Sequence, residues 1–220
     1  MTSTEVSQTH STPLQADHMI RLFNSCFQDS EQTVLIGGAT EPLYAPNSNR
    51  YPYHRIFFAH DYVRSSLHEI AHWMLAGKVR RHLLDYGYWY APDGRTPSQQ
   101  AAFEAVEVQP QAMEWILSLA AGVAFEVSLD NLSGDCPPDR VAFTNRVLDC
   151  ALARWLNGLP PRVEQFLPKL LEATGQERWT HAQLLEAAQK LRAVEHERAK
   201  RSGQSCILPP ERIEKERCCA

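Results

Sequence analysis

Two histidines four residues apart provide the most distinctive chemistry in this sequence. His68, Glu69 and His72 form an HExxH sequence, read in full as His-Glu-Ile-Ala-His. On a helix, positions i and i+4 lie one turn apart on the same face, so both imidazoles can reach one metal ion. The glutamate beside the first histidine is suited to act as a base or to order the site. The pattern predicts a metal site with His68 and His72 as ligands and Glu69 as a catalytic group.

A catalytic metal site needs a third protein ligand. The best donor segment is 103–111, where Glu104, Glu107 and Gln111 fall at i, i+3 and i+7 on one helical stripe. Glu107 is followed by Pro110 and Gln111, which loosely fits the pattern after the ligand glutamate in one group of zinc peptidases. We therefore choose Glu107 as the metal ligand, keep Glu104 as the second choice and expect Gln111 to support the site. The alternative is a solvated helix face for either carboxylate.

Two further groups are candidates for supporting roles. His60 precedes the motif and is expected to support a ligand, because ligating imidazoles usually need such partners. Tyr86, Tyr88 and Trp89 form a dense aromatic run with Asp93 close by. Aromatic faces beside a carboxylate can hold an alkylammonium group. We predict a substrate-binding wall there, and the alternative is an ordinary packed strand.

These side chains need particular elements to position them. The pattern predicts the motif helix over 65–76, begun by a serine cap and stopped by Gly77, and an extended segment over 79–90. A long helical pattern covers 97–121, and Pro110 is expected to kink or divide it. The other predicted elements are helices over 14–27, 139–156, 163–173 and 181–199, and strands over 33–36 and 53–59. The predicted class is α+β: a mainly helical single domain with a small sheet, an HExxH-helix architecture resembling a minimal zincin.

Composition limits the class of protein to which this sequence can belong. The chain has 220 residues, of which 44% are hydrophobic and 22% charged, and we expect a disordered leader over 1–13, one domain over 14–199 and a flexible tail over 200–220. The net charge of −4 argues against a nucleic-acid partner, which needs a cationic face. No secretory signal or membrane-spanning run is evident, and the six cysteines show no framework spacing. These features predict a cytoplasmic protein.

A series of longer strings resembles the bacterial elongation factor P hydroxylase family. The similarity runs from about residue 14 to about residue 166 and does not cover the C-terminal part. The strings are Phe58–His60, Ile70–Trp73, Ala76–Lys78, Tyr86–Tyr90, Pro92–Arg95, Phe103–Glu104, Val106–Val108, Pro110–Ala112, Asp130–Leu132, Gly134–Asp135 and Pro138–Val141. Because they are ordered and long, they are far more specific than HExxH alone.

The resemblance implies an oxygen-using oxidoreductase of the monooxygenase type. Such proteins hydroxylate the lysine side chain of elongation factor P after that lysine has been extended with β-lysine, in a fold unlike the jelly-roll oxygenases. Carried over by position, His68 and His72 are the imidazole ligands, and Glu107 is the carboxylate. Fe(II) is the expected metal, and Zn(II) can replace it in purified protein. 2-Oxoglutarate is not indicated, because no arginine is singled out to grip its distal carboxylate.

Two other classes of protein fit the same local residues. A zinc peptidase would use HExxH and a glutamate in the same way, with Glu69 as the general base for water. A non-catalytic binding module would hold a structural metal with four closed ligands, whereas an open coordination position would oppose that class. Only the wider resemblance favours the hydroxylase.

Overall fold

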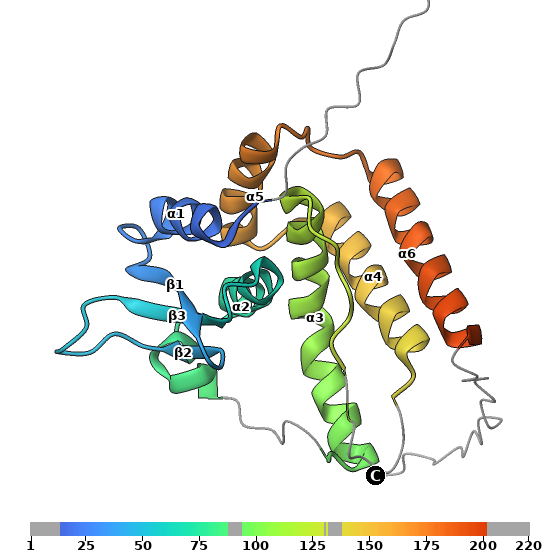
Figure 1. Ribbon diagram of the computed structural model, residues 1–220, viewed down its shortest axis with the longest axis horizontal. Helices are drawn as coiled ribbons and strands as arrows, with labels where there is room; N and C mark the ends of the chain where they lie inside the picture. Colours follow the sequence, from blue (N-terminus) through green and yellow to red (C-terminus); the bar gives the residue numbers. More distant parts are fainter. Residues whose placement is uncertain (1–13, 88–93, 130, 132–137, 202–220) are drawn as a thin grey trace, which may run out of the picture.

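The computed structural model describes residues 14–87, 94–129, 131 and 138–201, and places a small sheet beside a set of packed helices (Figure 1). The strands are β1 (Thr33–Ala39), β2 (Leu43–Ala45) and β3 (His54–Ala59). The α-helices are α1 (Ala16–Phe27), α2 (Val63–Leu75), α3 (Pro97–Ala121), α4 (Arg140–Asn157), α5 (Pro161–Thr174) and α6 (His181–Arg201). A mainly helical α+β protein with a small sheet agrees with the predicted class. The predicted leader, and the tail beyond residue 201, lie outside the described residues.

The sheet has the order β1-β3-β2. Strand β3 pairs parallel with β1, where Thr33 lies opposite His54, and antiparallel with β2. The parallel register shifts between Ile36 and Ala39. Gly37 suits this irregularity, because a Cβ there would lie 2.4 Å from a carboxylate oxygen of Asp61 and 2.9 Å from the buried ring of Phe58, and both would have to shift. Strand β3 buries alternate side chains, as expected of a strand with one covered face.

An aromatic cluster joins α1, α2 and α5 next to the sheet. The rings of Phe23 and Phe27 lie 5.2 and 4.9 Å from that of Trp73 on α2, and Phe23 also lies 5.9 Å from Phe166 on α5. All four side chains are fully buried. Offset and edge-on aromatic pairs add to the apolar area that each ring removes from water. This cluster fixes the inner face of α2, so that its opposite face is directed toward α3.

Helix α2 lies between the sheet and α3 (Figure 1). The predicted serine cap is wrong: the helix begins after Tyr62, and Ser66 lies inside it, donating to the Val63 carbonyl at 2.7 Å. At the other end, Arg162 on α5 donates to the carbonyls of Met74 and Ala76 at 3.1 and 2.5 Å. These bonds satisfy acceptors that the helix end would otherwise leave unpaired.

Helix α3 runs through Pro110 without being divided. It begins with a capping box, in which the Thr96 hydroxyl accepts from the backbone of Gln99 and the Gln99 side chain accepts from the backbone of Thr96. It ends at Gly122, whose φ of 67° suits a left-handed cap. Its last four turns are almost entirely buried against α2, α4 and α5, and this packing supports the helix across the proline.

The prediction of an extended segment over 79–90 is wrong for the part of it that is described. Residues Arg80–His82 and Leu84–Gly87 form short 3-10 turns, with positive φ at Asp85 and Tyr86. The turn is held from a distance, because a carboxylate oxygen of Asp85 accepts from the backbone of Tyr44 at 2.8 Å. The remainder of that segment, 88–90, lies outside the described residues.

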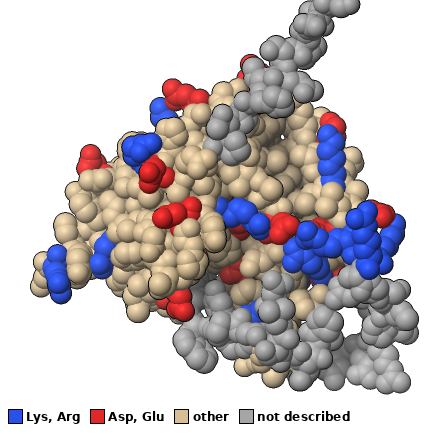
Figure 2. Space-filling view, in the orientation of Figure 1, with Lys and Arg blue, Asp and Glu red and all other residues tan. Residues whose placement is uncertain are grey.

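Basic side chains gather in the last turn of α6, next to acidic ones (Figure 2). Arg198 contacts Glu126 and Glu195, at 2.8 and 3.1 Å, and Lys200 contacts Glu197 at 2.7 Å. Two of the three basic residues in this turn, Arg198 and Lys200, are therefore paired with carboxylates. None of the helices in the described ranges has the length and apolar character needed to span a membrane.

Candidate metal centre

Helices α2 and α3 bring two imidazoles and one carboxylate to one point. His68 and His72 lie one turn apart on α2, with their Nε2 atoms 3.2 Å from each other. On α3, Glu107 places Oε1 3.3 Å from Nε2 of His72, and Oε2 3.9 Å from Nε2 of His68. One ligand atom from each residue falls within 4.8 Å of the others. This is the spacing expected of donors around a shared ion at about 2.0–2.2 Å from each.

Glu107 is held as a carboxylate in a site largely closed to water. Its exposed fraction is 1%, and burial by itself would raise the pKa of its carboxyl group. The imidazoles of His72 and His68 and the hydrogen bond from Gln111 outweigh burial and lower that pKa to about 2. Its buried Oε1 atom makes no hydrogen bond of regular geometry, although Nε2 of His72 lies 3.3 Å away. A cation bound between the two atoms would satisfy both.

A second carboxylate orients His68 by contacting Nδ1, the ring nitrogen that does not face the site. Oε2 of Glu114 lies 2.8 Å from Nδ1 of His68, and Glu114 is only 5% exposed. By accepting the Nδ1 proton, the carboxylate leaves Nε2 free to bind a metal ion. In the metal-free protein, burial lowers the pKa of His68, but Glu114 above all, with Glu69 and Glu107, raises it to about 10. A metal ion must therefore displace a proton from His68.

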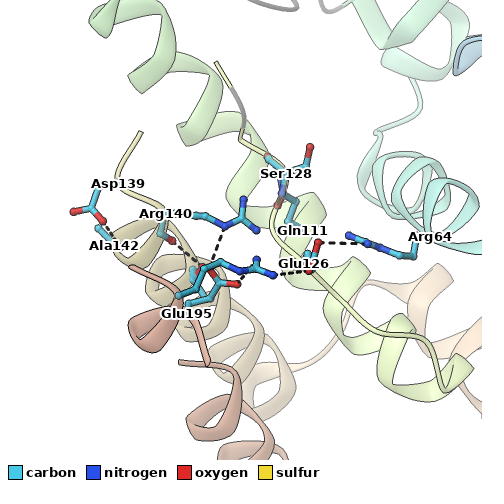
Figure 3. A network of polar contacts seen from close by, with 10 residues as sticks. Arg64, Gln111, Glu126, Ser128, Asp139, Arg140, Ala142 and Glu195 are labelled. Carbon is cyan, nitrogen blue, oxygen red and sulfur yellow. Dashed lines mark hydrogen bonds and ion pairs between the residues drawn. The ribbon is translucent and has the colours of Figure 1, made fainter. Parts of the chain in front are cut away.

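Gln111 fixes both Glu107 and the chain segment that follows α3. Its Nε2 donates to Oε2 of Glu107 at 3.1 Å and to the Ser128 carbonyl at 2.7 Å, and its Oε1 accepts from the Ser128 backbone at 2.9 Å. Figure 3 shows Gln111 beside Ser128, with Glu126 of the same segment contacting Arg64 at 3.6 Å. Gln111, which we expected to support the site, therefore lies next to Glu107, the carboxylate chosen as metal ligand.

Glu69, on α2, interacts electrostatically with the three candidate ligands and with Tyr86. Burial raises the pKa of its carboxyl group, although His68 and His72 act in the opposite direction. The Glu69 carboxylate also interacts electrostatically with Tyr86, whose own pKa is raised, first by burial. A carboxyl group with a raised pKa next to a metal site is suited to hold and release a proton.

Other residues singled out in the sequence lie elsewhere. Glu104, the second choice for the carboxylate ligand, forms an ion pair with Arg146 on α4 and accepts from Gln100 at 3.0 Å. It is not one of the three grouped ligand residues. His60 lies exposed at the end of β3, where its ring is 5.9 Å from that of Tyr62, and it contacts none of the three. The predicted wall residues Tyr88, Trp89 and Asp93 lie outside the described residues.

Glu114 was missed by sequence reasoning. The polar stripe of α3 continues from Glu107 and Gln111 to Glu114, at i, i+4 and i+7. Following the stripe one turn further would have identified Glu114 as a polar side chain on the same face of a buried helix.

The residues present fit a divalent transition-metal ion. Two imidazoles and one carboxylate are the donor set of a facial triad, which leaves further coordination positions open. Oε1 of Glu107 and the facing Nε2 atoms of His68 and His72 are the atoms that an ion would engage.

Comparison with known proteins assigns the chain to a family. The sequence profile of elongation factor P hydroxylase matches residues 22–184, which include both α2 and α3. The chain belongs to the elongation factor P hydroxylase family. The predicted resemblance is therefore confirmed.

A curated relative gives the same result. The chain is 47% identical over 148 residues to a protein of Haemophilus influenzae named elongation factor P lysine hydroxylase. The aligned part covers 67% of this chain and 83% of the relative. The family match ends at residue 184, so most of α6 lies beyond it. Neither comparison supports a peptidase.

Proposed function

We propose that this protein hydroxylates a lysine side chain of elongation factor P, and that the lysine carries an added β-lysyl group. The observation that carries the proposal is that the family match spans His68, His72 and Glu107, the three residues whose ligand atoms lie together. The name of the Haemophilus influenzae relative supports the same reaction. The partner is accordingly a protein rather than nucleic acid or a membrane, and we place the reaction in the cytoplasm.

We further propose Fe(II) as the metal, held by His68, His72 and Glu107. A bound iron ion would supply the redox chemistry needed to use molecular oxygen in a monooxygenase-type reaction. Zn(II) has no redox chemistry, so its presence in purified protein would mark exchange rather than the active form. The HExxH helix facing a carboxylate helix also supports the proposal that the architecture resembles a minimal zincin.

The chain's own residues would prepare this site in three ways. Glu114 holds His68 in the tautomer that presents Nε2. Gln111 orients the Glu107 carboxylate through a hydrogen bond at 3.1 Å. Glu69, with its raised pKa, would hold and release a proton beside the reacting atoms.

Substrate binding is proposed to involve the aromatic residues that follow α2. Tyr86 interacts electrostatically with Glu69, which supports a place near the reacting centre. Tyr88, Trp89 and Asp93 remain predicted contacts of the substrate's ammonium groups.

The test uses purified protein, β-lysylated elongation factor P and oxygen. After anaerobic loading with Fe(II), the modified lysine should gain the mass of one oxygen atom, located by peptide mass spectrometry. Zn(II)-loaded protein should give no gain, and elongation factor P without the β-lysyl group should react far less. Peptide cleavage under Zn(II), with no oxygen gain under Fe(II), would favour the peptidase instead.

A further inference from the structure

A cavity of about 940 Å³ adjoins the candidate metal centre. It lies between the C-terminal end of α2, the 3-10 turns, α3 and the start of α5, and His72 forms part of its wall. This volume is within the range of pockets that hold small molecules. A ligand in the cavity would therefore lie next to one of the candidate metal ligands.

The wall of this cavity is cationic. Four basic side chains line it: Lys78, Arg80, Arg154 and Arg162. Within the described part of the wall, the one carboxylate is Glu31, and Arg81 engages it at 2.5 Å. Glu31 is therefore engaged by an arginine outside this set of four.

Two of these arginines are held by neutral partners. Arg162 donates to the Met74 and Ala76 carbonyls, and its guanidinium lies 4.4 Å from the centre of the Trp73 ring. Arg154 donates to Oε1 of Gln109 at 2.6 Å. Neither guanidinium forms an ion pair with a carboxylate of the described residues. Burial lowers the pKa of Arg162 to about 10, which reflects the cost of keeping this charge away from water.

Two of the residues that line the cavity have buried polar atoms without hydrogen-bond partners. Tyr86 is 5% exposed and its ring stacks on Tyr44 at 4.2 Å, yet its buried hydroxyl has no hydrogen-bond partner. Nη1 of Arg162 is likewise buried without a partner. Buried donors are nearly always satisfied in folded proteins, by the protein itself, by water or by a ligand. A guanidinium can only donate and a tyrosine hydroxyl can also donate, so a single group that satisfies both is an acceptor.

We propose that this cavity binds a small oxyanion, a carboxylate or phosphate group, through Arg154, Arg162 and the Tyr86 hydroxyl. Guanidinium groups match the paired oxygens of carboxylate and phosphate, which accept two parallel hydrogen bonds. The inference depends on the charge and the unpaired donors of the wall, so it stands whether or not the protein is a hydroxylase. It also implies that a cationic lysine side chain reaches the metal centre by a route other than through this cavity.

Isothermal titration of the full-length protein with inorganic phosphate and with succinate tests the inference. At low ionic strength, at least one of the two should bind. Tighter binding of phosphate would indicate a phosphate ester as the natural ligand, and tighter binding of succinate would indicate a carboxylate. The metal content of each sample is measured, because either anion could also contact a bound metal ion directly.

Variants test whether the anion binds in the cavity. Arg154→Gln should weaken binding about tenfold, the loss expected for one charge-assisted hydrogen bond. Tyr86→Phe removes only a hydroxyl and should weaken it about fivefold. Arg21→Gln changes the net charge equally at an exposed position on α1 and should have no effect. The inference is overturned if neither anion binds, if Arg154→Gln binds as the unaltered protein does, or if Arg21→Gln weakens binding as much.

Discussion

Replacing Glu107 by glutamine is expected to weaken metal binding by a factor of roughly one hundred or more. Its carboxyl pKa of about 2, against the usual 4.5, measures how strongly the surrounding imidazoles favour the charged form. At about 1.4 kcal/mol for each pKa unit, that preference is about 3 kcal/mol. A divalent ion between the same groups brings at least as much positive charge. Losing the carboxylate should therefore cost at least this much binding free energy, which corresponds to a metal affinity about a hundredfold weaker.

Glu104→Gln is the matched control. Glu104 lies three residues earlier on the same helix, but it pairs with Arg146 and not with the histidines. Both variants remove one negative charge from α3. The assay is competition with a chelator under anaerobic conditions, with Fe(II) and separately with Zn(II). Glu104→Gln should change the affinity less than about threefold, the size of an exposed ion-pair effect.

Two results would refute this reasoning. If Glu107→Gln retains the affinity of the unaltered protein while Glu104→Gln loses metal, the ligand assignment is wrong. If both variants retain metal, the site does not depend on a carboxylate of α3 at all.

The remaining predictions concern protons, catalysis and stability. Glu114→Gln should lower the pKa of His68 in the metal-free protein from about 10 toward 6.5, since Glu114 is the main group that raises it, and an NMR titration of the ring would measure this. Because the folded pKa lies above the unfolded one, the stabilisation from His68 is complete below about pH 6.5 and is lost as pH rises through 10. Urea unfolding of the metal-free protein should show this loss, and Glu114→Gln should reduce it; equal slopes would contradict it. Glu69→Gln should retain metal but lose most of the hydroxylation rate, and normal turnover would remove its assigned role. Phe166→Ala should destabilise the protein by about 3–5 kcal/mol, and a change below about 1 kcal/mol in chemical denaturation would show that the aromatic cluster contributes little.

The parts of the site that follow helical periodicity could be predicted from the sequence. His68 and His72 repeat at i and i+4, and Glu107 and Gln111 do the same on α3, so local geometry alone places each pair on one face. The choice between the two glutamates depends on tertiary contacts. Glu104 pairs with Arg146, which lies 42 residues away on α4, and no local pattern predicts that pairing.

The segment after α2 shows where local reasoning fails. Its tyrosines and leucines favour a strand, but Asp85 and Tyr86 adopt positive φ and form a turn. Contacts from the distant β2 region stabilise this conformation: the Tyr44 backbone donates to Asp85, and the Tyr44 ring stacks on Tyr86. Strand β2 itself has three residues, and it is recognisable only through its pairing with β3.

The most direct test of the central claim is the mass of elongation factor P after reaction with two forms of this protein. The Fe(II)-loaded protein should add one oxygen atom to the β-lysylated lysine, and His72→Ala, which removes one proposed ligand, should add none. Oxygen addition at equal rates by both forms would contradict the claim that His68, His72 and Glu107 form the catalytic metal centre. Absence of any addition by the Fe(II)-loaded protein would contradict the proposed reaction itself.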